Sequence, residues 1–157
     1  MIDRYTRPQM KAIWDLKRKY EIWLAVELAA CAAFERAGQV PRGTSARIGK
    51  KATIDVKRIA RIEKVTKHDV IAFLESLVES VGPEHRFLHM GLTSSDIVDT
   101  SLAVQMTEAL DLILEGLDEL ISVLKRQALK HKNQVMVGRS HGIHCEPISF
   151  GFKLAIL

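Results

Sequence analysis

The stretch from His89 to Asp99 gathers several groups that could bind an anion. Three hydroxyl side chains, those of Thr93, Ser94 and Ser95, and the carboxylate of Asp96 stand between a glycine and the start of a long helical pattern. The first turn of a helix exposes unpaired backbone N–H groups and the positive end of the helix dipole. Neutral hydroxyl donors at that point predict a site for a carboxylate or a phosphate. The structural alternative is that Ser94 or Ser95 simply caps the helix.

A second polar cluster runs from Gly138 to His144, beyond the far end of the same helical pattern. The glycines around His141 let the backbone approach a ligand closely. Arg139 could hold a carboxylate or phosphate in its guanidinium fork, and an imidazole is the usual proton-transfer group near neutral pH. We therefore predict a functional role for His141. Two polar clusters at opposite ends of one helix also suggest a site that neighbouring chains complete.

Other chemistries fit this second cluster less well. His141, His144 and Cys145 are potential metal ligands, but the sequence has no CxxC and no HExxH pattern, so we predict no metal site. Ser140 is adjacent to His141, and adjacent residues rarely present their side chains to each other. The sequence also lacks a GxSxG elbow, a Walker loop and a GxGxxG turn. The remaining groups favour acid–base chemistry on a polyanion without a cofactor.

Two further histidines are candidate site residues. His68 precedes Asp69 at an expected helix start, where the Asp69 carboxylate could cap the helix and orient the imidazole. The alternative for this pair is a capped surface turn. His89 stands just before the hydroxyl cluster and could reach the same anion, and its alternative is a half-buried histidine in a loop.

The composition is typical of an ordinary globular protein. Of the 157 residues, 47% are apolar and 27% are charged. No window reaches the roughly 18 apolar residues of a membrane span, and the N-terminus lacks the apolar core of a signal peptide. We therefore expect a cytoplasmic protein without a membrane segment. The net charge of +4 is dispersed, which gives little support to nucleic-acid binding and suits a multiply anionic small substrate.

Helical patterns dominate the first 92 residues. Pro8 opens a first short helix, and Asp15 caps a longer one that stops at Gly38. On that longer helix, Cys31 lies among alanines and is expected to be a core residue. Residues 41–52 are expected to form a basic connection, and residues 66–69 to separate two further helices. Asp55 caps the first of these two helices, whose apolar face comprises Val56, Ile59, Ile62 and Val65, and the second runs from Val70 to Val81.

The longest helical pattern runs from Ser95 to about Lys130 and contains no proline. Such a helix would be roughly 50 Å long, and its apolar face needs partners either later in the chain or from other subunits. That face comprises Leu102, Met106, Leu110, Ile113, Leu117, Leu120, Ile121 and Leu124. After it, residues 134–137 predict a short extended stretch, and Pro147 is expected to open a last helix. Because that helix ends in mid-pattern at Leu157, we expect the chain to be a fragment.

Four motifs in this order resemble the adenylosuccinate lyase family of the fumarase/aspartase superfamily. They are Arg4-Tyr5 within Ile-Asp-Arg-Tyr, Lys67-His68-Asp69-Val70, Gly91-Leu92-Thr93-Ser94-Ser95-Asp96, and Gly138-Arg139-Ser140-His141-Gly142. The resemblance extends from Met1 to Leu157 and concerns the N-terminal part of that family. It implies an all-α fold, with a small N-terminal helical domain at residues 1–92 and the start of a long-helix bundle domain at residues 93–157. In this superfamily the bundle forms a homotetramer, and each active site draws residues from three subunits.

The activity that the resemblance implies is a β-elimination in purine nucleotide biosynthesis. It releases fumarate from adenylosuccinate, leaving AMP, and from the succinyl-carboxamide ribotide intermediate. The substrate is thus a small nucleotide, and no cofactor or metal is implied. The general base is implied beyond residue 157, so these residues alone are expected to have negligible activity.

Individual residues acquire roles through the same resemblance. His141 would be the general acid that protonates the departing nitrogen, and His68 is a second candidate for proton transfer. Thr93 and Ser94 would hold a succinyl carboxylate, and His89 would assist at the phosphate. The nucleotide would be contacted by Arg4, Tyr5, Lys67, His68 and Asp69.

Three alternatives stay open. The nearest is a sister lyase that releases fumarate from argininosuccinate, aspartate or another substrate, although Arg4-Tyr5 and Lys67-His68-Asp69 favour a nucleotide. A non-catalytic helical interaction protein becomes plausible if the gene itself ends near Leu157. A basic nucleic-acid binder is the third, and its binding would depend steeply on salt.

Overall fold

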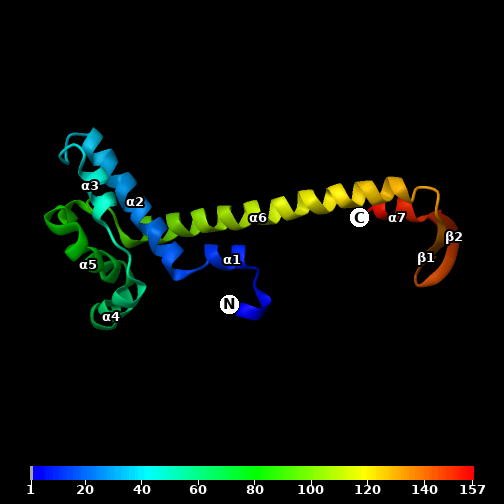
Figure 1. Cartoon of the computed structure of the whole chain (residues 1–157), viewed down its shortest axis with the longest axis horizontal. Coiled ribbons are helices and arrows are strands. Elements are labelled where there is room, and N and C mark those ends of the chain that lie inside the picture. Colours follow the sequence, from blue (N-terminus) through cyan, green and yellow to red (C-terminus); the bar gives the residue numbers. More distant parts are fainter. Residues whose placement is uncertain (1) are drawn as a thin grey trace. The chain divides into compact units, whose positions relative to one another are not determined.

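A computed structural model describes residues 2–157 of the protein (Figure 1). The chain forms two compact units, one that ends at Ala109 and one that spans Leu110–Leu157. Helices account for most of the chain, which confirms the all-α prediction, and one small two-stranded sheet is added in the second unit. The helices are α1 (Pro8–Ile13), α2 (Leu16–Arg36), α3 (Thr44–Lys51), α4 (Val56–Thr66), α5 (Asp69–Val81), α6 (Ser94–Lys130) and α7 (Phe150–Ala155), with 3₁₀ helices at Asp3–Tyr5 and Gly82–Phe87.

Several helix ends lie where the local sequence predicts them. Pro8 is the first residue of α1, and the Asp15 carboxylate accepts a hydrogen bond of 2.8 Å from the Lys17 N–H at the start of α2. The chain leaves α2 through Gly38, whose φ of 74° is one that glycine adopts easily. Asp55 accepts from two N–H groups in the first turn of α4. Side-chain oxygens pair these otherwise free N–H groups at Asp15 and Asp55, whereas Pro8 needs no N–H partner at the first helical position and Gly38 supplies the left-handed backbone.

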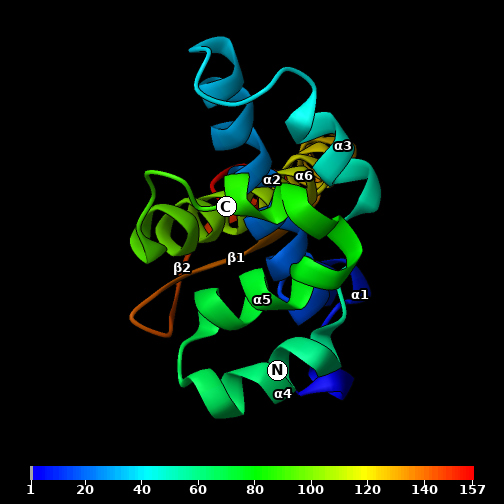
Figure 2. The ribbon, with the colours of Figure 1, turned by 90° about the vertical axis from the view of Figure 1, so that its left-hand side faces the viewer.

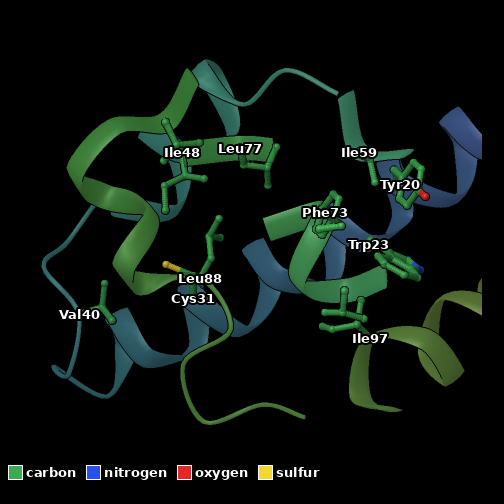
Figure 3. Close-up of a cluster of buried hydrophobic side chains, with 13 residues drawn as sticks. Tyr20, Trp23, Cys31, Val40, Ile48, Ile59, Phe73, Leu77, Leu88 and Ile97 are labelled. Atoms are coloured by element: carbon green, nitrogen blue, oxygen red, sulfur yellow. The ribbon is translucent and has the colours of Figure 1, made fainter. Parts of the chain in front are cut away.

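The core of the first unit lies between α2, α3, α4, α5 and the first turns of α6 (Figure 3). Tyr20, Trp23 and Phe73 form an aromatic cluster with ring centroids 5.3 to 5.8 Å apart. Figure 2 shows α4 and α5 beside each other. Cys31 is 1% exposed, as predicted for a core cysteine, and burial raises the pKa of its thiol.

Polar contacts fix the start of α6 against the first two helices. The Trp23 indole N–H donates to the Ser101 hydroxyl over 2.8 Å. Gln105 donates to the Ile13 carbonyl, and Arg18 forms an ion pair with Glu108. These groups lie on one face of α6, at intervals of three and four residues, so that face is held by the first unit.

The second unit contains the end of α6, a β-hairpin and α7. Strands β1 (Val135–Ser140) and β2 (Ile143–Ser149) pair antiparallel, with an irregularity between Val137 and Arg139. Helix α7 approaches the end of α6 closely, because the Gly151 N–H donates to the His131 carbonyl and a Cβ on Gly151 would overlap the Ala128 backbone. Glycine is therefore required at this crossing.

Three sequence predictions about the elements are wrong. Residues 41–52 contain helix α3, whose first N–H groups are capped by Glu35, a residue of the preceding helix. Pro147 lies inside β2, and α7 begins at Phe150 with Ser149 as its cap. Proline has no N–H to donate. It is tolerated there because each strand of a two-stranded sheet has one outer edge where no partner strand needs that N–H. Val65 is 83% exposed, so the apolar face of α4 stops before its last turn.

The expected boundary between residues 92 and 93 falls at the start of α6 and remains a prediction. Among the described residues, no helix is both long and apolar enough to cross a membrane.

Candidate functional site

The link between α4 and α5 carries three of the predicted site residues. Lys67 ends α4 with a left-handed backbone, φ 53°, and its N–H donates to the Glu63 carbonyl over 2.8 Å. His68, the next residue, has an extended backbone conformation, and its Nδ1 accepts a long hydrogen bond of 3.5 Å from the Ile71 N–H. The cap of α5 is thus His68, and the prediction that Asp69 caps it is wrong, since Asp69 is already the first helical residue. The His68 and Lys67 side chains are exposed and available to a ligand.

His68 and Asp69 also lie close to each other. The distance between His68 Nδ1 and Asp69 Oδ1 is 3.6 Å. The two side chains are 46% and 42% exposed, so solvent screens their interaction. Because Nδ1 already accepts from the Ile71 N–H, it has no proton to donate to the carboxylate, so the orientation of the imidazole by Asp69 stays a prediction.

The start of α6 presents the predicted hydroxyls together with a carboxylate. The helix begins at Ser94, so neither Ser94 nor Ser95 is the residue before the helix, and the prediction that one of them caps it is wrong. That position belongs to Thr93, whose N–H donates to Asp96 Oδ2 over 2.8 Å in a capping-box-like arrangement. Within residues 2–157, the hydroxyls of Thr93 and Ser94 have no hydrogen-bond partner. Together with Ser95, whose hydroxyl likewise has no partner among the described residues, they remain free for an anion.

His89 lies in the turn that leads to α6. Its backbone is left-handed, φ 59°, and its side chain is 20% exposed. Both its N–H and its Nδ1 contact the carboxylate of Glu27, at 2.6 and 2.7 Å. Two residues later, a Cβ on Gly91 would lie 3.0 Å from the ring of Phe34. The turn is thus packed against α2, which positions His89.

His141 lies at the tip of the β-hairpin in the second unit. Residues 141 and 142 form a two-residue turn in which both have positive φ, 52° and 77°. Two positive φ values define the type I′ turn that fits the twist of a hairpin. Arg139 donates to the Gly142 carbonyl over 3.2 Å, across this turn. The imidazole of His141 is exposed at this turn.

Arg4 and Tyr5 lie in the first 3₁₀ helix, and both side chains are exposed. The Arg4 guanidinium carbon is 4.7 Å from the centroid of the Tyr5 ring, a cation–π distance. The pair offers a flat aromatic face and a positive charge, which are groups that suit a nucleotide. No set of three or more His, Cys, Asp or Glu side chains in the described part of the chain is arranged to hold a metal ion.

Three of the predicted site residues share an unusual backbone. Within the described range, Lys67, His89 and His141 are the residues other than glycine that have positive φ. Such strain accumulates where a side chain is needed at one fixed position, so the observation supports each of these residues as a candidate functional residue. Glu27 was missed from the sequence, although a carboxylate one turn after Trp23 and one turn before Cys31 interrupts a buried helix face and needs a partner there.

Comparison with known proteins identifies the family. The chain matches the lyase family over residues 3–157. It belongs to that family. Among curated lyase-family relatives, adenylosuccinate lyase from Synechocystis sp. is 52% identical over 155 residues, and adenylosuccinate lyase from Bacillus subtilis is 44% identical over 156 residues. Each alignment covers 99% of this chain and 36% of the relative, so the chain spans 36% of the length of these two relatives.

Solved structures agree with this lyase-family assignment. The crystal structure of fumarate lyase from Mesorhizobium sp. has a TM-score of 0.87 at 25% identity, over 94% of this chain and 36% of that one. The 3-carboxy-cis,cis-muconate lactonizing enzyme from Pseudomonas putida has the same TM-score, 0.87, at 32% identity, over 99% and 37% of the two chains. Proteins with different named reactions thus share this fold, so the fold alone does not define the substrate.

Proposed function

We propose that the full-length protein is a carbon–nitrogen lyase that releases fumarate from adenylosuccinate, giving AMP. The same active site would act on the succinyl-carboxamide ribotide intermediate of purine nucleotide biosynthesis. The observation that carries the proposal is the left-handed set Lys67, His89 and His141, found in a chain 52% and 44% identical to two adenylosuccinate lyases. The substrate is a small nucleotide, and the reaction needs no cofactor or metal from this chain.

The residues of this chain would have two roles: some would stabilise the negative charge that develops on the substrate, and others would transfer protons. Removal of a proton beside a carboxylate builds negative charge on that carboxylate. The hydroxyls of Thr93 and Ser94 and the N-terminus of α6 would stabilise that charge as it develops. The His141 imidazole would donate a proton to the departing nitrogen, and a general acid must lie within hydrogen-bond reach of that atom. His68 is the second candidate for a proton-transfer role.

The nucleotide would be held by exposed groups of the first unit. Arg4 and Tyr5 supply a charge and an aromatic face, and Lys67 supplies a second positive charge. Asp69 would orient His68, and His89 would assist at the phosphate. The proposal includes a cytoplasmic homotetramer with shared active sites. Its support is α6, which buries only Ile97, Ser101, Gln105 and Ala109 among the described residues.

The test is fumarate release from adenylosuccinate by the complete gene product, followed by its absorbance. We expect turnover by the natural protein and a loss of about 10²- to 10⁴-fold in kcat for His141→Ala, the range of a general acid. His144→Ala is the matched control, because His144 is an exposed histidine of the same hairpin, paired with Arg139. It should turn over normally.

Two outcomes would contradict the proposal. No fumarate from adenylosuccinate, with release from argininosuccinate or aspartate, would make the protein a sister lyase. A His141→Ala variant with a near-normal rate would remove His141 as the acid.

A further inference from the structure

Glu27 is a buried acid with an unusual set of partners. It lies in the middle of α2 and is 1% exposed, on the same helix face as Trp23 and Cys31. A carboxylate removed from water is costly unless it is paired and hydrogen-bonded. In the part of the chain that the structure describes, its hydrogen-bond and ion-pair partners belong to one residue, His89.

The two carboxylate oxygens bind two different parts of His89. Oε2 accepts from the backbone N–H at 2.6 Å, and Oε1 lies 2.7 Å from Nδ1 of the ring. The first contact holds a backbone conformation that residues with a side chain rarely adopt. The second fixes the rotation of the ring and leaves Nε2 as the ring nitrogen without a hydrogen-bond partner among the described residues. An ionised Glu27 only accepts hydrogen bonds, so Nδ1 would carry the proton in this contact.

We infer that Glu27 is a positioning residue, which acts through His89 by fixing both its backbone and its Nδ1–H so that Nε2 faces the substrate. A buried carboxylate behind a histidine is the arrangement that selects one tautomer and one ring orientation. The kinetic test of this inference rests on the proposed function. Its spectroscopic test depends on the Glu27–His89 geometry alone. It adds to the active site a residue that lies in the core and touches no substrate.

The kinetic test is a double-mutant cycle on the complete gene product with adenylosuccinate as substrate. Glu27→Gln keeps the shape of the side chain, but its amide accepts at one oxygen only and cannot satisfy both donors. We expect KM to rise and kcat/KM to fall by roughly tenfold to a hundredfold, the range of one hydrogen bond to a charged group. In a His89→Gln background the same Glu27→Gln change should have no further effect on kcat/KM.

A merely structural role gives a different result. Glu27→Gln would then lower the melting temperature and would reduce kcat/KM by the same factor in both backgrounds. That additivity would overturn the inference, as would a His89→Gln variant with normal kinetics.

Glu35→Gln is the matched control. Glu35 also lies on α2, and its carboxylate also accepts two backbone N–H bonds, from Gly43 and Ser45, which lower the pKa of the carboxyl. It caps α3 and touches none of the candidate site residues. Glu35→Gln should lower the melting temperature while KM stays unchanged.

A second measurement separates this inference from the proposed function. ¹⁵N NMR of the histidine-labelled complete protein, with His89→Gln used to locate the signals, reports which ring nitrogen of His89 carries the proton. We expect a protonated Nδ1 in the natural protein and a shift toward the Nε2–H form in Glu27→Gln. Absence of fumarate release together with this spectrum would remove the proposed function and keep the role of Glu27. An unprotonated Nδ1 in the natural protein would overturn the inference whether or not Glu27→Gln folds.

Discussion

Single residues of this chain hold strained conformations where the chemistry is expected. A left-handed backbone costs an L-residue about 1–2 kcal/mol, and glycine would adopt it freely. Lys67, His89 and His141 nevertheless occupy such positions. Each is fixed by its surroundings: Lys67 by the end of α4, His89 by Glu27, and His141 by the hairpin turn. A side chain retained at that cost indicates that the side chain is needed.

Lys67 allows the cost of strain and the value of the charge to be measured separately. We expect Lys67→Gly to stabilise the full-length protein by about 1 kcal/mol, because glycine relieves the positive φ. Lys67→Ala removes the charge and keeps the strain, so its stability should stay near that of the natural protein. Both variants should lose about tenfold or more in kcat/KM if the Lys67 charge contacts the nucleotide as proposed, since the loss of a contact worth about 1.4 kcal/mol is tenfold. Thermal unfolding and fumarate release measure the two effects.

Equal stability of the Gly and Ala variants would contradict the strain argument. Normal kcat/KM in both variants would remove Lys67 from the site.

At the scale of elements, the sequence predicts what local chemistry controls. Asp15, Asp55 and Gly38 act within their own helix ends, so α2 and α4 could be placed from neighbouring residues alone. Helix α3 could not, because its cap is Glu35, eight residues before Gly43 and on another helix. From the sequence, only a short extended stretch is predicted where the structure has a hairpin. The reason is that β2, which includes Pro147, is stabilised by its pairing with β1, and such pairing has no signature within one segment.

The candidate site follows the same division. His68, His89, Thr93 and His141 could be found as residues beside glycines, hydroxyls and helix starts. Glu27 could not be assigned a role, since its meaning depends on a partner 62 residues away. The positive φ of His89 is likewise a property of the folded turn rather than of its local sequence.

The hairpin that carries His141 depends on two glycines for different reasons. A Cβ on Gly138 would lie 2.5 Å from the Glu146 carbonyl oxygen, which is backbone and cannot move aside cheaply. Gly138→Ala should therefore cost about 1–3 kcal/mol and increase hydrogen exchange throughout the hairpin. Gly142 has open space around its Cα, and its constraint is the φ of 77° alone. Because asparagine tolerates a left-handed backbone, Gly142→Asn should cost only a few tenths of a kcal/mol.

Hydrogen exchange and thermal unfolding of the two full-length variants provide the comparison. If both substitutions had the same effect, the close approach at Gly138 would not be what shapes this hairpin.

At the scale of the whole molecule, the longest helix keeps much of its apolar surface uncovered within the described residues. Helix α6 has 37 residues and is about 55 Å long. Six of its large apolar side chains between Leu110 and Ile121 are 45% to 59% exposed: Leu110, Ile113, Leu114, Leu117, Leu120 and Ile121. They recur at intervals of three and four residues, so they form one continuous stripe. Contiguous apolar stripes of this kind are typical of interaction surfaces between subunits or domains.

If this stripe forms the interface of the proposed homotetramer, a single charged substitution on it should disrupt assembly. Leu117 lies on it and is 45% exposed in the chain. In an assembled bundle Leu117→Glu would bury an unpaired carboxylate, which should weaken association by about a hundredfold or more. Ser122→Glu adds the same charge to the exposed opposite side of α6 and should leave assembly intact. Sedimentation of the full-length proteins reads the result directly. A natural protein that sediments as a monomer, or a Leu117→Glu variant that assembles as well as Ser122→Glu, would mean that this stripe has a different partner.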